Sequence, residues 1–171
     1  MSPPSAALDG FDWRLSLAGV TAPGPFSAFP GVDRTLCVLE GVLELEVEGA
    51  AGPRRLDPQS AAWRFPGDVE VFGRPIGGPV TDLNLMVRRA AFVGSVRRQP
   101  AGFAPPAPSK ACATVLVAAA SMTVRVGPVP HDLDRFDALL FDPDGPGEDP
   151  VWLSAPAIAV TVHAKGGGAG S

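Results

Sequence analysis

The sequence predicts an all-β fold made of two antiparallel β-barrel, or jelly-roll, halves that pack together. Three observations lead to this prediction. Short segments of alternating apolar and polar residues recur along the chain, and almost no stretch shows the period of a helix. Turn-forming residues separate these segments, since glycine and proline number 20 each among 171 residues. A weak internal repeat indicates that the same unit occurs twice.

Strand-like segments fill the first half of the chain. The clearest of them places Leu43, Leu45 and Val47 on one face and three glutamates on the other, as expected for a strand with one buried and one solvated face. The acidic face also discourages pairing with other strands. The strand-like segments of this half are residues 11–20, 34–49, 61–73 and 80–96.

A proline-rich joint divides the chain. Residues 97–110 contain four prolines and a glycine, which exclude a helix or a central strand. We therefore predict a first half over residues 1–96 and a second half over residues 111–165. The Gly/Ser tail, residues 166–171, cannot bury enough surface to become ordered and is predicted to be disordered.

The repeat relates the two halves and points to the first as the half that holds any site. At its offsets Arg34 corresponds to Cys112 and Asn84 to Thr161, so the second half lacks the charged residues of the first. The aligned segments are residues 35–49 with 113–127 at an offset of 78, 56–65 with 133–142 at 77, and 80–87 with 157–164 at 77.

Composition excludes several classes of partner. Lys and Arg number 14 against 18 Asp and Glu, a net charge of −4, so the chain has no excess of cations for nucleic-acid phosphates. It has no apolar stretch of the ~18 residues that cross a membrane and no signal peptide at its start, so we expect a cytoplasmic protein. Cys37 and Cys112 lie in apolar segments and are expected to be buried free thiols.

Several blocks resemble known motifs. "CVLEG" with the strand after it, and "FPGDVEVFG", resemble the two motifs of the cupin superfamily. In more detail, "FDWRLSLAGV", "GPFSAFPGVDRTLCVLEG" and "VTDLNLMVRR" resemble, in the same order, blocks of the HutD/Ves family of bicupins, over about residues 11–165. We expect the chain to lack that family's N-terminal Gly-rich segment with its Thr-Arg-Glu stretch; if that segment lines the pocket, its absence leaves the site incomplete.

The resemblance implies an accessory or regulatory role linked to histidine utilisation. It makes formylated or formiminated glutamate plausible ligands. Aligned on "VLEG", Arg34 takes the place where a metal cupin has a glutamate ligand, and the histidine positions fall near Phe29 and Pro30. The chain has two histidines, His131 and His163, both outside this motif. We therefore predict no metal and no other cofactor.

Arg34 is the central candidate for ligand binding. If its side chain points inward, its buried guanidinium must be paired, because an unpaired buried charge is strongly unfavourable. A guanidinium suits a carboxylate in bidentate geometry, which predicts an anionic small molecule as ligand. An internal salt bridge with Asp33, Glu40 or Asp82 explains the same residue, and the two interpretations are compatible.

Further candidates lie on the strand "TDLNLMVRR". Asp82, Asn84 and Arg88 share one face of it. If buried, Asn84 needs hydrogen-bond partners, so it contacts a ligand or belongs to an internal network. Arg88, at the strand end, is a surface charge or part of the site. Phe29 lies just before a rigid Pro-Gly turn and belongs to the core or to a pocket wall.

These residues favour a metal-free cupin that binds a small acidic metabolite. A second hypothesis is a metal-independent enzyme that acts on a small carboxylate, with Asp82 or Glu40 as base; a raised pKa beside a dry pocket would support it. A third is an interaction module in which an exposed sheet edge mediates a homodimer.

Overall fold

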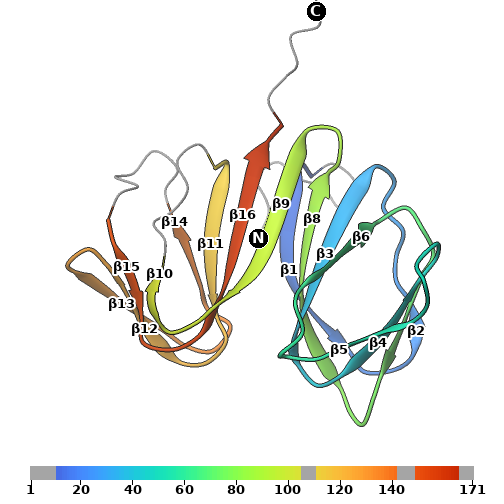
Figure 1. Cartoon of the computed structure of the whole chain (residues 1–171), viewed down its shortest axis with the longest axis horizontal. Helices are drawn as coiled ribbons and strands as arrows, with labels where there is room; N and C mark the ends of the chain where they lie inside the picture. The colour runs from blue at the N-terminus through green and yellow to red at the C-terminus, as the bar shows by residue number, and fades with distance from the viewer. Residues whose placement is uncertain (1–10, 105–110, 142–148, 166–171) are drawn as a thin grey trace, which may run out of the picture. The chain divides into compact units, whose positions relative to one another are not determined.

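A computed structural model gives the structure of residues 11–104, 111–141 and 149–165. Strands and the turns between them make up these residues, and none of them is helical, so no helix here is long and apolar enough to cross a membrane. The chain divides into two compact units, Met1–Phe92 and Val93–Ser171. Each unit is described by itself below (Figure 1).

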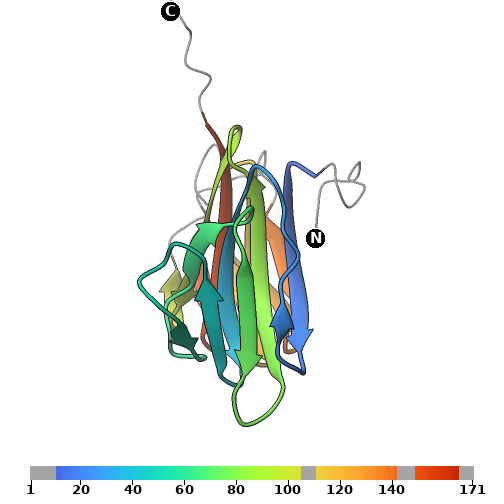
Figure 2. The same cartoon turned by 90° about the vertical axis from the view of Figure 1, so that its right-hand side faces the viewer.

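The first unit is a pair of four-stranded antiparallel sheets. One sheet has the strand order β1-β8-β3-β6 and the other β2-β7-β4-β5 (Figure 1 and Figure 2). The strands in chain order are β1 (Trp13–Val20), β2 (Gly24–Pro25), β3 (Val32–Glu40), β4 (Leu43–Val47), β5 (Arg54–Leu56), β6 (Trp63–Pro66), β7 (Val71–Pro75) and β8 (Val80–Arg88).

The second unit has the same plan. Its sheets have the orders β14-β11-β16-β9 and β10-β15-β12-β13. The strands in chain order are β9 (Phe92–Gln99), β10 (Gly102–Ala104), β11 (Ala113–Ala118), β12 (Met122–Val126), β13 (Val129–Leu133), β14 (Ala138–Phe141), β15 (Val151–Leu153) and β16 (Ala157–Ala164).

The two units are copies of one topology, because adding eight to each strand number of the first gives the strand orders of the second. The sequence repeat also reproduces the strand register. Leu36 pairs with Asn84 between β3 and β8, and Thr114 pairs with Thr161 between β11 and β16, as the offsets of 78 and 77 require. The predicted all-β fold with two antiparallel barrel halves is confirmed.

Each unit packs its two sheets around an apolar core of its own, because alternate residues of every strand point inward. In the first unit the buried cluster consists of Leu36, Val38, Leu43, Leu45, Val47, Leu56, Phe65, Val71 and Val80. In the second it consists of Leu116, Ala118, Met122, Val124, Val151, Leu153 and Ala157.

Two details differ from the predictions. The boundary between the halves lies at Phe92–Val93 rather than after residue 96, because β9 pairs with β16 and so belongs to the second unit. Part of the predicted joint is therefore strand, in β9 and β10, and both are edge strands. Cys37 is buried and in no disulfide, as predicted, but Cys112 is exposed, contrary to the prediction.

A short strap, residues 24–30, crosses the first unit between β1 and β3. Backbone hydrogen bonds hold it at two points, from the Phe26 N–H to the Val71 carbonyl (2.8 Å) and from the Phe29 N–H to the Gly67 carbonyl (2.7 Å). Glycine at position 73 makes room for the strap, since a Cβ there would lie 2.7 Å from Cε1 of Phe26. The Phe26 ring thus packs directly over β7.

We predict that Gly73→Ala displaces the Phe26 ring and destabilises the chain by about 1–2 kcal/mol, because overpacking forces neighbours to shift. Gly19→Ala is the matched control, since a Cβ at position 19 of β1 would meet nothing within 4 Å. Chemical denaturation of both variants measures the difference. Equal stability of the two would show that the ring is not seated against β7.

Candidate functional site

The site is centred on Arg34, near the start of β3. Its side chain is 5% exposed, although arginine is among the residues least often buried. Nη1 donates a hydrogen bond to the Ser27 carbonyl in the strap (3.2 Å), and Nη2 donates to Oδ1 of Asn84 on β8 (3.0 Å). The guanidinium is therefore held from the strap on one side and from the neighbouring strand on the other.

Aromatic rings surround the same guanidinium. Its Cζ lies 5.0 Å from the ring centroid of Phe26, 5.6 Å from that of Phe65 and 5.9 Å from that of Phe29. At these distances each ring face attracts the cation. The rings also exclude water, so the cation and any anion beside it interact in a medium of low dielectric constant.

Asp82 and Asn84 come from β8, the strand next to β3. Their side chains are 0% and 3% exposed. The antiparallel register pairs Leu36 with Asn84, which places Asn84 diagonally across from Arg34. Asn84 Nδ2 donates in turn to Oδ1 of Asp82. A buried polar chain thus runs from Arg34 through Asn84 to Asp82.

In this group of three buried polar side chains, two buried atoms have no hydrogen-bond partner among the described residues: Nε of Arg34 and Oδ2 of Asp82. Buried polar atoms are nearly always satisfied in proteins, so an unsatisfied pair points to a bound molecule or water. One of the two atoms is a donor and the other is an acceptor when Asp82 is ionised. Both atoms are buried, so a molecule that reaches them would meet one donor and one acceptor.

Burial and mutual attraction act in opposite directions on this pair of charges. Burial raises the pKa of Asp82 to about 7, although the nearby positive charge of Arg34 lowers it. Burial likewise lowers the pKa of Arg34, and the negative charge of Asp82 counteracts that effect. Asp82 therefore exchanges a proton near neutral pH, whereas most aspartates remain ionised there.

A cavity of about 380 Å³ lies beside Arg34, Asn84 and Asp82. It is within the usual size range of small-molecule pockets. β1 supplies one wall, because its register with β8 places Arg14 opposite Met86 and Ser16 opposite Asn84. The lining residues are Arg14, Ser16, Leu17, Ala18, Val20, Pro25, Phe26, Ser27, Phe29, Arg34, Asp82, Asn84 and Met86.

Four of the seven predicted site residues meet at this cavity: Arg34, Asp82, Asn84 and Phe29. Asp33 does not, because neighbouring strand residues point to opposite faces. It instead pairs with Arg64 and with Nε of Arg89 (2.6 Å). Burial acts to raise the pKa of Asp33, but the hydrogen bonds from the two arginines outweigh it, and the pKa lies below its usual value.

Glu40 and Arg88 also lie away from the cavity. Glu40 is at the far end of β3, where it accepts a hydrogen bond from the Thr81 hydroxyl (3.0 Å). Arg88 ends β8, and its Nε donates to the Phe11 carbonyl (3.2 Å). This hydrogen bond fixes the segment before β1. It also supports Phe29, because the ring centroids of Phe11 and Phe29 are 6.2 Å apart.

Sequence reasoning missed the wall that faces the predicted residues. Arg14 and Ser16 belong to a segment recognised as an alternating strand, and their parity places them on one face. That this face opposes Asp82 and Asn84 depends on the pairing of β1 with β8, which the alternation does not reveal. Phe26, which lines the cavity over Arg34, is an aromatic of the same motif as Phe29, and the sequence left both as core or pocket wall.

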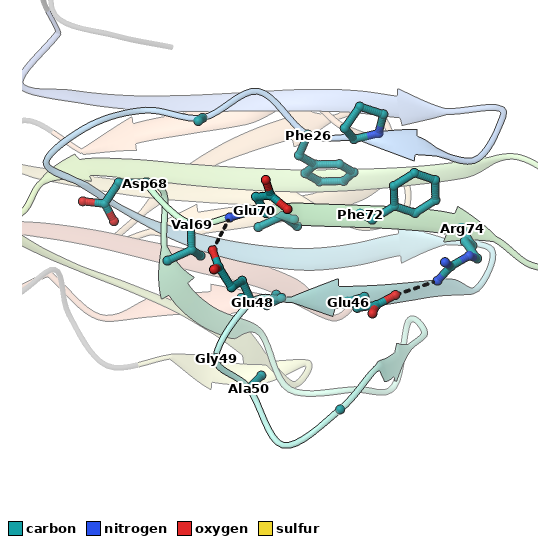
Figure 3. A pocket seen from close by; sticks show the side chains of 15 residues that line it. Phe26, Glu46, Glu48, Gly49, Ala50, Asp68, Val69, Glu70, Phe72 and Arg74 are labelled. Atoms are coloured by element: carbon teal, nitrogen blue, oxygen red, sulfur yellow. Dashed lines mark hydrogen bonds and ion pairs between the residues drawn. The ribbon is translucent and has the colours of Figure 1, made fainter.

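A larger groove, of about 750 Å³, is lined by residues of the strap, of β4, of β7 and of the turns next to them (Figure 3). Pro25 and Phe26 line both hollows. Figure 3 shows Arg74 reaching Glu46 and the Glu70 N–H donating to Glu48. Four carboxylates line this groove against one arginine, so it repels anions; the smaller cavity, with its buried cation, is the better anion site.

Metal ligands do not converge in the part of the chain that the structure describes. No three His, Cys, Asp or Glu side chains there are close enough together to hold one ion. At the cavity the charged lining groups are Arg14, Arg34 and Asp82, of which Asp82 alone is a usual metal ligand.

The two matching barrels with a polar pocket in the first define a protein of the cupin fold. A cupin 2 conserved barrel domain protein from Leptotrichia buccalis shares this fold, with a TM-score of 0.57 at 9% identity, over 90% of this chain and 84% of that one. Sequence comparison identifies the family. Residues 1–163 match the HutD family model, and the chain belongs to the HutD family.

Solved structures of higher identity agree. HutD from Pseudomonas fluorescens SBW25 has a TM-score of 0.81 at 27% identity, over 97% of this chain and 86% of that chain. A conserved protein of unknown function from Pseudomonas aeruginosa PAO1 has a TM-score of 0.80 at 29% identity, over 96% of this chain and 89% of that chain.

Two relatives are similar to this chain in sequence. An uncharacterized 21.2 kDa protein in the hutC 3′ region of Pseudomonas putida is 33% identical over 136 residues, 75% of this chain. Protein Ves of Citrobacter koseri is 37% identical over 95 residues, 55% of this chain. The matches span 65% and 49% of the lengths of these two relatives.

We predict that Asp82 makes stability depend on pH. Its pKa in the folded chain, about 7, exceeds the ordinary value of 3.8, so the folded state binds the proton more tightly and unfolding becomes easier as pH rises between these values. Asp82→Asn removes this dependence. Between pH 5 and 7 the free energy of unfolding of the wild type should fall by about 2 kcal/mol relative to the variant.

Chemical denaturation of both proteins at pH 5, 6, 7 and 8 measures this difference. Because the other titratable groups are common to both, their contributions largely cancel. A constant difference across the series, or one that changes in favour of the wild type, would contradict the raised pKa.

Proposed function

We propose that this chain is a metal-free binding protein that holds a small carboxylate in the cavity of its first unit. The observation that carries the proposal is the buried guanidinium of Arg34, whose Nε has no partner among the described residues and which lines a cavity. Because guanidinium hydrogen bonds to carboxylates are charge-assisted, an anionic oxygen at this position satisfies the donor and balances its charge.

Arg14 suggests a second anionic group on the ligand. It lines the same cavity from β1, and its register partner Met86 lies between it and Arg34 in the sheet. Two cations around one small cavity favour a dicarboxylate, with one carboxylate at each arginine. Ser16, Ser27 and Asn84 provide further polar groups, and Phe26 and Phe29 provide apolar contact for the carbon chain.

The relative from the hutC 3′ region supports a role for this protein in histidine utilisation. We propose that the role is accessory or regulatory, in the cytoplasm, and that the ligand is an acidic intermediate. Formylated and formiminated glutamate are dicarboxylates and so match the two arginines. A homodimer stays a prediction.

An enzyme is the second candidate, and Asp82 favours it. A carboxylate that titrates near pH 7 beside a small cavity is suited to accept or donate a proton during a reaction. Product formation from N-formylglutamate or formiminoglutamate, followed by mass spectrometry and abolished in Asp82→Asn, would establish the enzyme. Unchanged acids after prolonged incubation with the protein would favour binding alone.

We predict that N-formyl-L-glutamate and glutarate raise the melting temperature of the wild type and not that of Arg34→Met. At a concentration 100 times Kd, binding adds about 2.7 kcal/mol to the free energy of unfolding. Arg55→Met, which removes an exposed arginine of β5, should leave the shift intact. The proposal fails if neither acid stabilises the wild type, or if Arg34→Met responds as the wild type does.

We further expect Arg14→Met to discriminate between ligands. It should weaken glutarate about tenfold, consistent with the loss of one charged hydrogen bond, and leave butyrate nearly unchanged. Calorimetric titration of both acids into both proteins gives the two ratios. An equal loss for the two acids would assign Arg14 a general electrostatic effect rather than contact with a second carboxylate.

A further inference from the structure

We propose that Asp82 binds the carboxylate as an acid: a proton enters the site with the anion, and the protonated Oδ2 of Asp82 donates a hydrogen bond to it. This inference rests on the proposed function and adds to it a proton partner and a rule for pH. Asp82 thereby helps to determine which ligands the cavity accepts.

The geometry of Asp82 leaves one of its oxygens for the ligand. Oδ1 accepts the hydrogen bond from Nδ2 of Asn84. Oδ2 has no partner in the described part of the chain, and the side chain is fully buried. Because Asp82 and Arg34 both line the cavity, an anion bound to Arg34 lies in the same cavity as Asp82.

The charges that face Asp82 determine whether it becomes protonated when an anion binds in the cavity. β3 contributes Arg34, β1 contributes Arg14, and its own strand contributes the neutral Asn84. The strap contributes Phe26, Ser27 and Phe29, none of them charged, and β6 contributes Phe65 over the guanidinium. Two cations and one anion thus become two cations and three anions when a dicarboxylate binds.

Three anionic groups in one small cavity repel one another, and water screens this repulsion poorly at Asp82 because its side chain is fully buried. Carboxylates that share a site respond by holding a proton between them. Burial has already raised the pKa of Asp82 to about 7, so only a modest further increase protonates it at neutral pH.

The proposed step is the binding of one proton to Asp82. One proton from solvent bonds to Oδ2, no other bond forms or breaks, and the new O–H donates to a ligand oxygen. A hydrogen bond from a carboxylic acid to a carboxylate is charge-assisted and short. Oδ2 then has a partner, and Nε of Arg34 donates to the same carboxylate.

The alternative has the opposite dependence on pH. If Asp82 instead stays ionised and accepts a hydrogen bond from a ligand N–H, affinity improves as pH rises through about 7. If Asp82 takes up a proton, affinity is nearly constant below pH 7. Above pH 7 it falls by about tenfold per pH unit until the pKa of the complex is reached.

Calorimetric titration of the wild type with glutarate tests the proposal, since glutarate has no N–H. At pH 8, heats measured in Tris and in HEPES differ in proportion to the protons exchanged, because the two buffers have different ionisation enthalpies. We expect a net uptake of protons at pH 8 and close to none at pH 5.5. Binding at pH 8 with no uptake, or with release of a proton, overturns the proposal.

Asp82→Asn provides the second measurement. Its amide keeps the acceptor Oδ1 for Asn84 and donates permanently in place of the acid. The variant should bind glutarate with no proton uptake and with an affinity that changes less than twofold between pH 6 and 8.5. Glu70→Gln, an exposed carboxylate of the same unit, is the control that keeps the wild-type uptake. A variant that binds glutarate and still takes up a proton overturns the assignment to Asp82.

Different results contradict the proposed function and the role of Asp82. If neither glutarate nor N-formylglutamate gives heat or a thermal shift at any pH, the proposed function is wrong. If both acids bind and Arg34→Met abolishes binding, but no proton is taken up at pH 8, the proposed function stands and the role of Asp82 is wrong. The wild-type buffer comparison decides this even if Asp82→Asn does not fold.

Discussion

A buried cation governs the first unit of this protein. The guanidinium of Arg34 lies inside a barrel whose core is otherwise apolar except for Asn84 and Asp82, and three aromatic rings surround it. Such a charge must be compensated nearby, because burying an ion without a partner is far more unfavourable than burying a polar group. The Ser27 carbonyl of the strap and the polar face of β8 meet this requirement, and the burial of Asp82 beside the cation raises the pKa of that carboxyl.

The neighbouring backbone is shaped to the same side chain. Glycine at position 67 lets the turn before β7 approach closely, since a Cβ there would lie 3.0 Å from the Val32 carbonyl oxygen and 3.2 Å from Cγ of Arg34. Gly73 allows the strap to lie flat enough for Phe26 to cover the guanidinium. Two glycines, one in the turn between β6 and β7 and one in β7, therefore determine how tightly the cation is enclosed.

Much of this architecture could be predicted from the sequence, because period-two alternation and the repeat are properties of nearby residues. The inward direction of Arg34 and the polar face of Asp82 and Asn84 followed from the cupin alignment and from strand parity. The opposite wall did not, since Arg14 joins the site through pairing between β1 and β8, which are 60 or more residues apart in the chain. Asp33 was misplaced for a related reason: proximity in sequence to Arg34 puts it on the opposite face of β3, where Arg64 and Arg89 hold it.

The duplication gives this chain an internal reference. At the repeat offsets, the positions of Arg34, Asn84 and Asp82 are taken in the second unit by Cys112, Thr161 and Ala159, and the second barrel has the same strand order around an apolar core. The topology can therefore be built without a buried charge, and apolar replacements of buried ion pairs are often as stable or more so. The polar chain is thus an addition to a scaffold that does not need it, and the difference between the two units separates what makes a barrel from what makes a pocket.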